Sequence, residues 1–161
     1  MARKVYSAIG ALVLVLLVVQ FFLGGLGVFT VFLQSESGQP TKDVFKTAET
    51  TFGVHAINGI TIFVSLLVML ACSFIARNPW RVTGLTALAA VMVFLQPILA
   101  HTPFAALSAL HLVNALAITS IVFYLTWSTW KFGRRAATST TVGARRSEPV
   151  SDLDQAEEAL C

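Results

Sequence analysis

The sequence predicts an all-α integral membrane protein, built as an antiparallel four-helix bundle with a weak internal two-fold repeat. Of its 161 residues, 56% are hydrophobic and only 12% are charged, whereas soluble domains carry a charge on about a quarter of their residues. The chain contains four long apolar stretches, and roughly 20 apolar residues are enough to cross a bilayer as a helix. Short connections between the stretches favour antiparallel neighbours.

The four membrane spans are expected within residues 1–135, at about 5–26, 52–76, 82–100 and 103–130. The first span is too long for a signal peptide and is expected to stay as an anchor. The Gly-Gly-Leu-Gly stretch at 24–27 is expected to end it, and residues 34–50 form the one substantial loop. Residues 136–161 are rich in Ala, Ser and Thr and then acidic, so a disordered cytoplasmic tail is expected there.

The orientation follows from basic residues near the span ends, because cytoplasmic loops carry an excess of Lys and Arg. One side holds Arg3, Lys4, Arg77, Arg81, Lys131, Arg134, Arg135, Arg145 and Arg146, and the other side holds only Lys42 and Lys46. We therefore expect a multi-pass protein of the cell (inner) membrane with both termini in the cytoplasm. An interfacial aromatic belt is predicted from Tyr6, Trp80, Tyr124, Trp127 and Trp130.

The charge pattern reports topology, so no nucleic-acid partner is predicted, and the bilayer is the partner that composition implies. Cys72 and Cys161 fit no metal-spacing or prenylation pattern. No acid, base and nucleophile converge in the sequence. We therefore predict no catalytic residues, and the question of enzymatic activity stays open.

Two apolar spans carry the same polar pattern, and this pattern is the main functional signal. HAINGI at 55–60 and HLVNAL at 111–116 each place an Asn three residues after a His. The first and third spans carry a Gln in similar contexts, VVQFFL at Gln20 and FLQPIL at Gln96. The chain is thus expected to consist of two parallel repeats, each a Gln helix followed by a His helix.

These polar side chains are expected to share one layer, because polar residues within a span usually face the bundle interior. At a rise of 1.5 Å per residue, His55 lies roughly 5 Å and His111 roughly 10 Å below the outer boundary. Asn58 and Asn114 lie one turn deeper, on the same faces as the histidines. No comparable cluster is expected in the inner half.

Two histidines facing each other from alternate helices favour a b-type haem, because its iron takes an imidazole nitrogen on each face. His55 and His111 would be the axial metal ligands. Gly59 and Ala115, four residues after each His, are small enough to leave room for the ring. Weaker outer roles fall to Gln20, Gln96, Asn58, Asn114 and His101, since metal-ligating histidines usually bond through their other nitrogen.

The succession H-x-x-N-G, LQP and LH-x-x-N-A-L resembles a family of small four-helix bacterial membrane proteins that has no established activity. This resemblance runs from about Val5 to Arg135 and supports the fold. The layout also resembles one half of haem A synthase, which implies haem held between histidines of the second and fourth helices, here His55 and His111. That family places a catalytic glutamate one turn before a histidine. Glu49 lies six residues before His55, which argues against haem-oxidising chemistry.

Three functions remain open at this stage. The first is a haem protein for electron transfer or haem handling near the outer face, with a quinone or a membrane redox protein as the candidate partner. The second is a cofactor-free structural or assembly subunit, whose histidines only form interhelical hydrogen bonds. The third, ranked last, is a small carrier of quinone, lipid or protons. The sequence sets neither the oligomeric state nor the redox potential.

Overall fold

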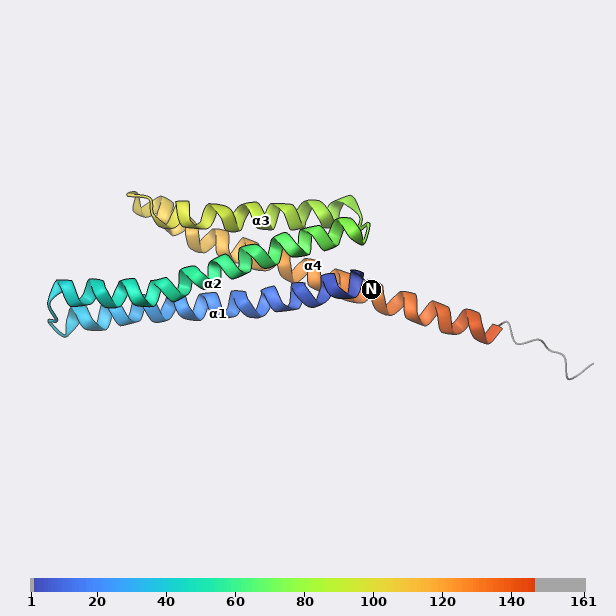
Figure 1. Ribbon diagram of the computed structural model, residues 1–161, viewed down its shortest axis with the longest axis horizontal. Coiled ribbons are helices and arrows are strands. Elements are labelled where there is room, and N and C mark those ends of the chain that lie inside the picture. The colour runs from blue at the N-terminus through green and yellow to red at the C-terminus, as the bar shows by residue number, and fades with distance from the viewer. Residues whose placement is uncertain (1, 147–161) are drawn as a thin grey trace, which may run out of the picture.

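The computed structural model describes residues 2–146, with side chains for 2–104 and 106–129, and contains four helices (Figure 1). They are α1 (Ala2–Glu36), α2 (Thr41–Ile75), α3 (Trp80–Ala100) and α4 (Ala105–Arg146). No strand occurs within the described residues. The predicted all-α fold is therefore confirmed.

All four helices are long and apolar enough to cross a membrane, as expected for a multi-pass membrane protein. The helices α1 and α2 have 35 residues each, or about 52 Å at 1.5 Å per residue. The hydrocarbon core of a bilayer is only about 30 Å thick. The two helices are thus much longer than a span requires, whereas the 21 residues of α3 match one closely.

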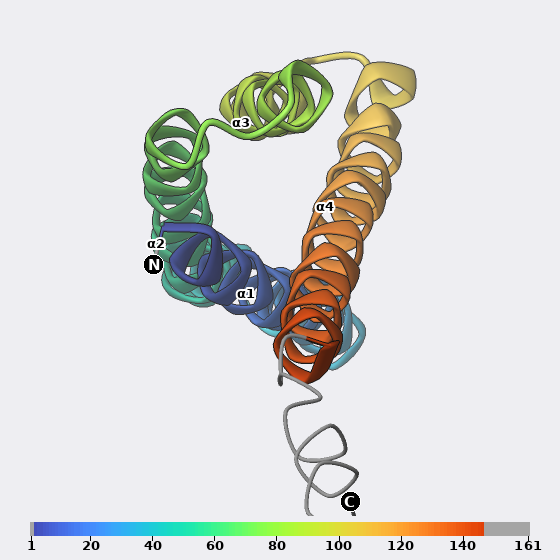
Figure 2. The same ribbon diagram turned by 90° about the vertical axis from the view of Figure 1, so that its right-hand side faces the viewer.

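The helices form a four-sided ring in which each contacts its two neighbours (Figure 2). The contacting pairs are α1 with α2, α2 with α3, α3 with α4, and α4 with α1. Within the described residues, the diagonal pairs α1–α3 and α2–α4 do not touch at the backbone level. A rotation that exchanges α1 with α3 and α2 with α4 preserves this pattern of neighbours. The order of neighbours is thus the same for the two helix pairs, although α1 has 35 residues and α3 has 21.

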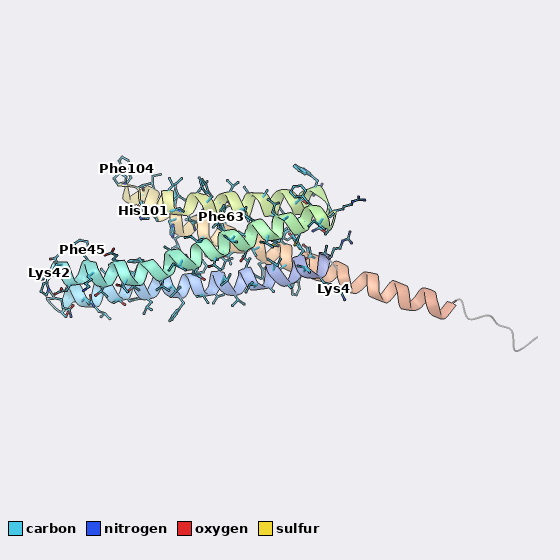
Figure 3. All side chains as sticks on the ribbon, in the orientation of Figure 1. Lys4, Lys42, Phe45, Phe63, His101 and Phe104 are labelled. Carbon is cyan, nitrogen blue, oxygen red and sulfur yellow. The ribbon has the colours of Figure 1, made fainter. Side chains whose placement is uncertain are left out.

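The two ends of the bundle differ in shape. Figure 3 shows Lys42 and Phe45 at the tip of the α1–α2 hairpin, which projects beyond the α3–α4 turn with His101 and Phe104. We call this the hairpin end. Lys4 lies at the opposite end, here called the N-terminal end, where α2 also turns into α3 at residues 76–79.

The predicted loop at 34–50 is wrong. The helix α1 continues through the glycines at 24–27 to Glu36, and α2 begins at Thr41, so the connection is residues 37–40 alone. Gly38 adopts a φ of 71°, which glycine reaches without steric cost. Pro40, with φ −56°, starts α2 because a proline before the first turn loses no helical hydrogen bond. Most of the polar residues predicted to form this loop therefore lie on the surfaces of α1 and α2.

The helix α4 also extends further than expected, to Arg146. The predicted disordered tail began at residue 136, so residues 136–146 are helical instead. No proline lies between Pro103 and Pro149, so no proline ends the helix before residue 146. The rest of the predicted tail, 147–161, lies outside the described residues.

The buried core occupies the N-terminal part of the bundle. It draws on all four helices and consists of Tyr6, Val13, Leu17, Ile62, Leu66, Met69, Ala89, Ala90, Val93, Ile118, Val122 and Leu125. The alanines of α3 and Gly10 of α1 let backbones approach closely, as small residues do in membrane bundles. The four helices are therefore packed most tightly away from the hairpin end.

Of the residues predicted to form an aromatic belt, Trp130 has its side chain outside the described residues. Trp80, Tyr124 and Trp127 are exposed on the bundle surface. Tyr6, by contrast, is fully buried, and its hydroxyl shares a 2.8 Å hydrogen bond with Thr86 Oγ1 of α3. A tyrosine whose hydroxyl finds a partner inside the bundle does not need the membrane interface.

Adding a methyl group at Gly10 tests this packing. A Cβ there would lie 2.5 Å from Thr126 Oγ1 and 3.3 Å from Met69 Cε. We expect Gly10→Ala to destabilise the bundle by about 1–3 kcal/mol, the usual cost of overpacking, measured by detergent-titrated unfolding with circular dichroism. Gly25→Ala is the control, since no atom lies within 4 Å of its Cβ position. Equal stability of the two variants would contradict the close contact.

Candidate functional site

A layer of polar side chains crosses the bundle on the hairpin side of the buried core. We call it the His–Asn layer; its six members come from all four helices and are Gln20, His55, Asn58, Gln96, His111 and Asn114. Each of the six is partly buried. Every member of the core cluster lies on the N-terminal side of this layer. The structure thus brings together the six polar residues that the sequence placed at one depth.

Both asparagines donate across a helix pair to a backbone carbonyl. Asn58 Nδ2 donates to the Leu16 carbonyl oxygen at 3.0 Å, and Asn114 Nδ2 donates to that of Met92 at 2.8 Å. Leu16 precedes Gln20 by four residues, and Met92 precedes Gln96 by four. The two contacts are therefore equivalent, which extends the internal repeat from sequence to hydrogen bonding.

His55 packs against α1 through its nitrogen-bearing edge. Its Nε2 lies 3.0 Å from Gln20 Nε2, and its Nδ1 is buried without a hydrogen-bond partner. A Cβ built on Gly24 would lie 3.2 Å from His55 Cε1 and 3.4 Å from Nδ1. Gly24 therefore gives the ring its place beside α1. From the sequence, Gly24 is predicted only to be part of the end of the first span.

His111 makes a different contact with the equivalent glutamine. Its Nδ1 lies 3.1 Å from the backbone carbonyl oxygen of Gln96. A carbonyl only accepts, so Nδ1 carries the proton and Nε2 carries the lone pair in the neutral ring. The side-chain Oε1 of Gln96 is buried and has no partner. The two repeats share their asparagine contacts but differ at their glutamines.

The two imidazoles meet across the diagonal of the ring. Their centroids are 6.4 Å apart and their planes are tilted by 45°. An imidazole nitrogen binds a metal at roughly 2 Å, so two imidazoles that share one metal ion have centroids about 6 Å apart. The centroid separation of His55 and His111 is of this order, but the His55 nitrogens lie along α1, so a shared metal would require the His55 ring to turn.

The small residues of the layer have other neighbours than expected. A Cβ at Gly59 would lie 3.3 Å from Gln20 Nε2, so Gly59 makes room for the glutamine side chain. Ala115 is partly buried, and its carbonyl accepts a hydrogen bond from Thr119. His101 is exposed at the α3–α4 turn, where its Nδ1 contacts the Pro97 carbonyl oxygen at 2.8 Å.

Phe52 closes the layer toward the hairpin. Its ring meets His55 edge-on with centroids 6.4 Å apart, and a Cβ at Gly27 would lie within 3 Å of it. Phe52 also lines a hollow of about 370 Å³ between the tips of α1 and α2. The layer is thus bounded by the core on one side and by this aromatic ring on α2 on the other.

The N-terminal half contains a set of hydroxyl contacts, contrary to the expectation that it lacks a polar cluster. Tyr6 bonds Thr86, Ser7 bonds Thr129, and Ser73 bonds Thr83, at 2.8 to 3.0 Å. These pairs tie α1 to α3, α1 to α4 and α2 to α3. These contacts could not be predicted from the sequence, because Ser and Thr hydroxyls also bond carbonyls of their own helix, as Thr86 does with the Val82 carbonyl.

Within the described residues, no three His, Cys, Asp or Glu side chains gather as a metal-binding group. Cys72 is a free, partly buried thiol; Cys161 lies outside the described residues.

Residues 44–106 match a family described as one of unknown function (DUF6220). The matched segment covers most of α2 and all of α3 and includes His55, Asn58 and Gln96, whereas His111 and Asn114 lie beyond it. No curated protein and no solved structure matched the chain.

A double-mutant cycle tests the difference between the repeats. Asn58 Nδ2 donates to Gln20 Oε1 at 2.6 Å, whereas Asn114 bonds only the Met92 backbone. We expect Asn58→Leu and Gln20→Leu to be coupled by about 0.5–1.5 kcal/mol in unfolding free energy. The matched pair, Asn114→Leu and Gln96→Leu, is expected to be additive. Equal coupling energies in both cycles would refute this asymmetry.

Proposed function

We propose that this membrane protein holds a b-type haem between His55 and His111 and serves in electron transfer or haem handling. One observation carries this function: the imidazoles of His55 and His111, on diagonally opposed helices, lie at a centroid separation of 6.4 Å. A single axial histidine would not need a partner at this height. Here the two histidines occur in repeated sequence contexts, on helices that are joined to their neighbours by equivalent asparagine contacts.

The ligand set fits best at His111. Its Nδ1–H donates to the Gln96 carbonyl, which is the outer hydrogen bond that typically orients a metal-ligating histidine. Its Nε2 then has a lone pair for iron. At His55 the nitrogens lie along α1, so ligation requires the ring to leave Gln20 and turn toward the axis. Gly59 and Ala115, in this proposal, offer little bulk next to the ligands.

The packing of the bundle allows the layer to widen for a macrocycle. Every residue of the core cluster lies on the N-terminal side, and on the hairpin side the described helices bury little beyond Gly27 and Val44. Separation of the helices at the layer therefore leaves the core contacts in place. Loosely packed regions open at the lowest free-energy cost.

A bound haem would supply one-electron chemistry at this site. If His55 and His111 both held the iron, no position would be left for oxygen or substrate, which would favour electron transfer over oxygen activation. The protein's part is to exclude water through the apolar core and to orient His111 through the Gln96 carbonyl. A membrane quinone or a membrane redox protein is the proposed partner.

A cofactor-free structural or assembly subunit is the second candidate, and one observation favours it. Both asparagines, both histidines and Gln20 already have hydrogen-bond partners within the protein. Side chains that bond to a neighbouring helix in this way can serve simply to join helices. This function predicts a colourless protein that purifies with other subunits and tolerates replacement of either histidine.

Spectra of the purified protein separate the two functions. We expect reduced-minus-oxidised spectra with the sharp bands of low-spin haem, because both axial ligands are imidazoles. His55→Ala and His111→Ala are each expected to abolish the low-spin spectrum. His101→Ala is the matched control, since His101 is exposed outside the layer, and it keeps the spectrum. Absence of haem bands, with no uptake of added haemin, would exclude haem binding.

We also propose that the protein resides in the cell (inner) membrane with the N-terminal end in the cytoplasm, following the distribution of basic residues. In a Cys72→Ala background, a membrane-impermeant thiol reagent on intact cells is expected to label Ser37→Cys at the hairpin tip but not the native Cys161. The opposite labelling pattern would invert this topology.

A further inference from the structure

We propose that Gln20 is a positioning residue that sets the tautomer of His55 and covers the nitrogen through which His55 would bind iron. The tautomer assignment stands on hydrogen-bond geometry alone. Its consequence for ligand binding rests on the proposed function. The side chains involved are Asn58, Gln20 and His55, on the two helices α1 and α2.

The direction of the hydrogen bonds is fixed by a backbone carbonyl at one end of the chain of contacts. The Leu16 carbonyl only accepts, so the Asn58 atom 3.0 Å from it must be the amide nitrogen. The same nitrogen lies 2.6 Å from a terminal atom of Gln20, which must therefore be its oxygen, Oε1. The other terminal atom of Gln20, the one beside His55, is then the amide nitrogen.

This order leaves one neutral form of His55. The Gln20 Nε2–H group can only donate, so the His55 Nε2 at 3.0 Å must accept with its lone pair. In a neutral imidazole the proton is then on Nδ1. That nitrogen is buried without a hydrogen-bond partner, beside Gly24, where a Cβ would come within 3.4 Å. Gln20 thus imposes a tautomer in which the proton on Nδ1 has no hydrogen-bond acceptor.

The same tautomer at His111 has a different cause. There the Gln96 backbone carbonyl accepts from Nδ1, and no glutamine amide covers Nε2. Both histidines therefore hold the proton at Nδ1 and the lone pair at Nε2. At His111 the lone pair is left for a metal, whereas at His55 the Gln20 amide occupies it.

The Gln20 amide consequently occupies the position beside His55 Nε2 that iron would take. Ligation at His55 needs no proton transfer, because the tautomer is already correct, but it requires the Gln20 hydrogen bond to break. His111 would therefore hold the iron more readily than His55 would. Loss of the Gln20 amide should favour binding by both histidines over binding by His111 alone by up to about tenfold, the contribution of one hydrogen bond.

The tautomer can be read directly by nitrogen-15 NMR of histidine-labelled, haem-free protein in lipid nanodiscs. The chain has three histidines, which single His→Ala variants assign. We expect protonated Nδ1 and unprotonated Nε2 at both His55 and His111. Gln20→Leu and Asn58→Leu should each abolish the single-tautomer pattern at His55. Asn114→Leu, the matched asparagine in the other repeat, should leave the His55 pattern unchanged.

Different outcomes overturn different parts. A protonated Nε2 at His55 in the wild type, or an unchanged pattern in Gln20→Leu and in the length-matched Gln20→Met, would overturn the tautomer assignment. If the tautomer is as stated but Gln20→Leu leaves the ratio of high-spin to low-spin haem unchanged, Gln20 does not cover the ligand position. If no variant binds haem, the proposed function falls while the tautomer assignment stands.

Discussion

The arrangement of the whole layer depends on two hydrogen bonds from asparagine amides to backbone carbonyls. In an apolar medium a buried amide must find an acceptor, and the carbonyls of Leu16 and Met92 provide it across the α1–α2 and α3–α4 pairs. Each bond fixes how far one helix is shifted along its neighbour. A shift by one turn, about 5.4 Å, would break the bond. It would also move the histidine, which lies about one turn from the asparagine on the same helix, out of the His–Asn layer.

The same bond made twice yields a nearly symmetric scaffold with an asymmetric centre. Each bond lies within one helix pair, and the imidazoles of the two pairs have centroids 6.4 Å apart. The glutamines break this symmetry, because Gln20 reaches the partner histidine with its side chain and Gln96 with its backbone. The two repeats thus place their histidines close together but leave the Nε2 atoms of the two rings with different neighbours.

Much of this could be predicted from the sequence, because apolar run length and the depth of polar residues are set by the bilayer. The four helices and the meeting of His55 with His111 followed from those two quantities. The helical hairpin beyond the membrane did not, because polar residues outside a bilayer form loops and helices equally well. The burial of Tyr6 and the different roles of Gln20 and Gln96 depend on side-chain contacts between helices, which spacing along one chain does not encode.

Whether the axis of this bundle is a cofactor site is tested most directly by the amount of haem that purifies with the protein. Pigment analysis of protein made in haem-replete cells should give haem equimolar with the chain. The double variant His55→Ala/His111→Ala should contain none while keeping its helical content by circular dichroism. Haem absent from the wild-type protein, or present at the same ratio in the double variant, would contradict the account.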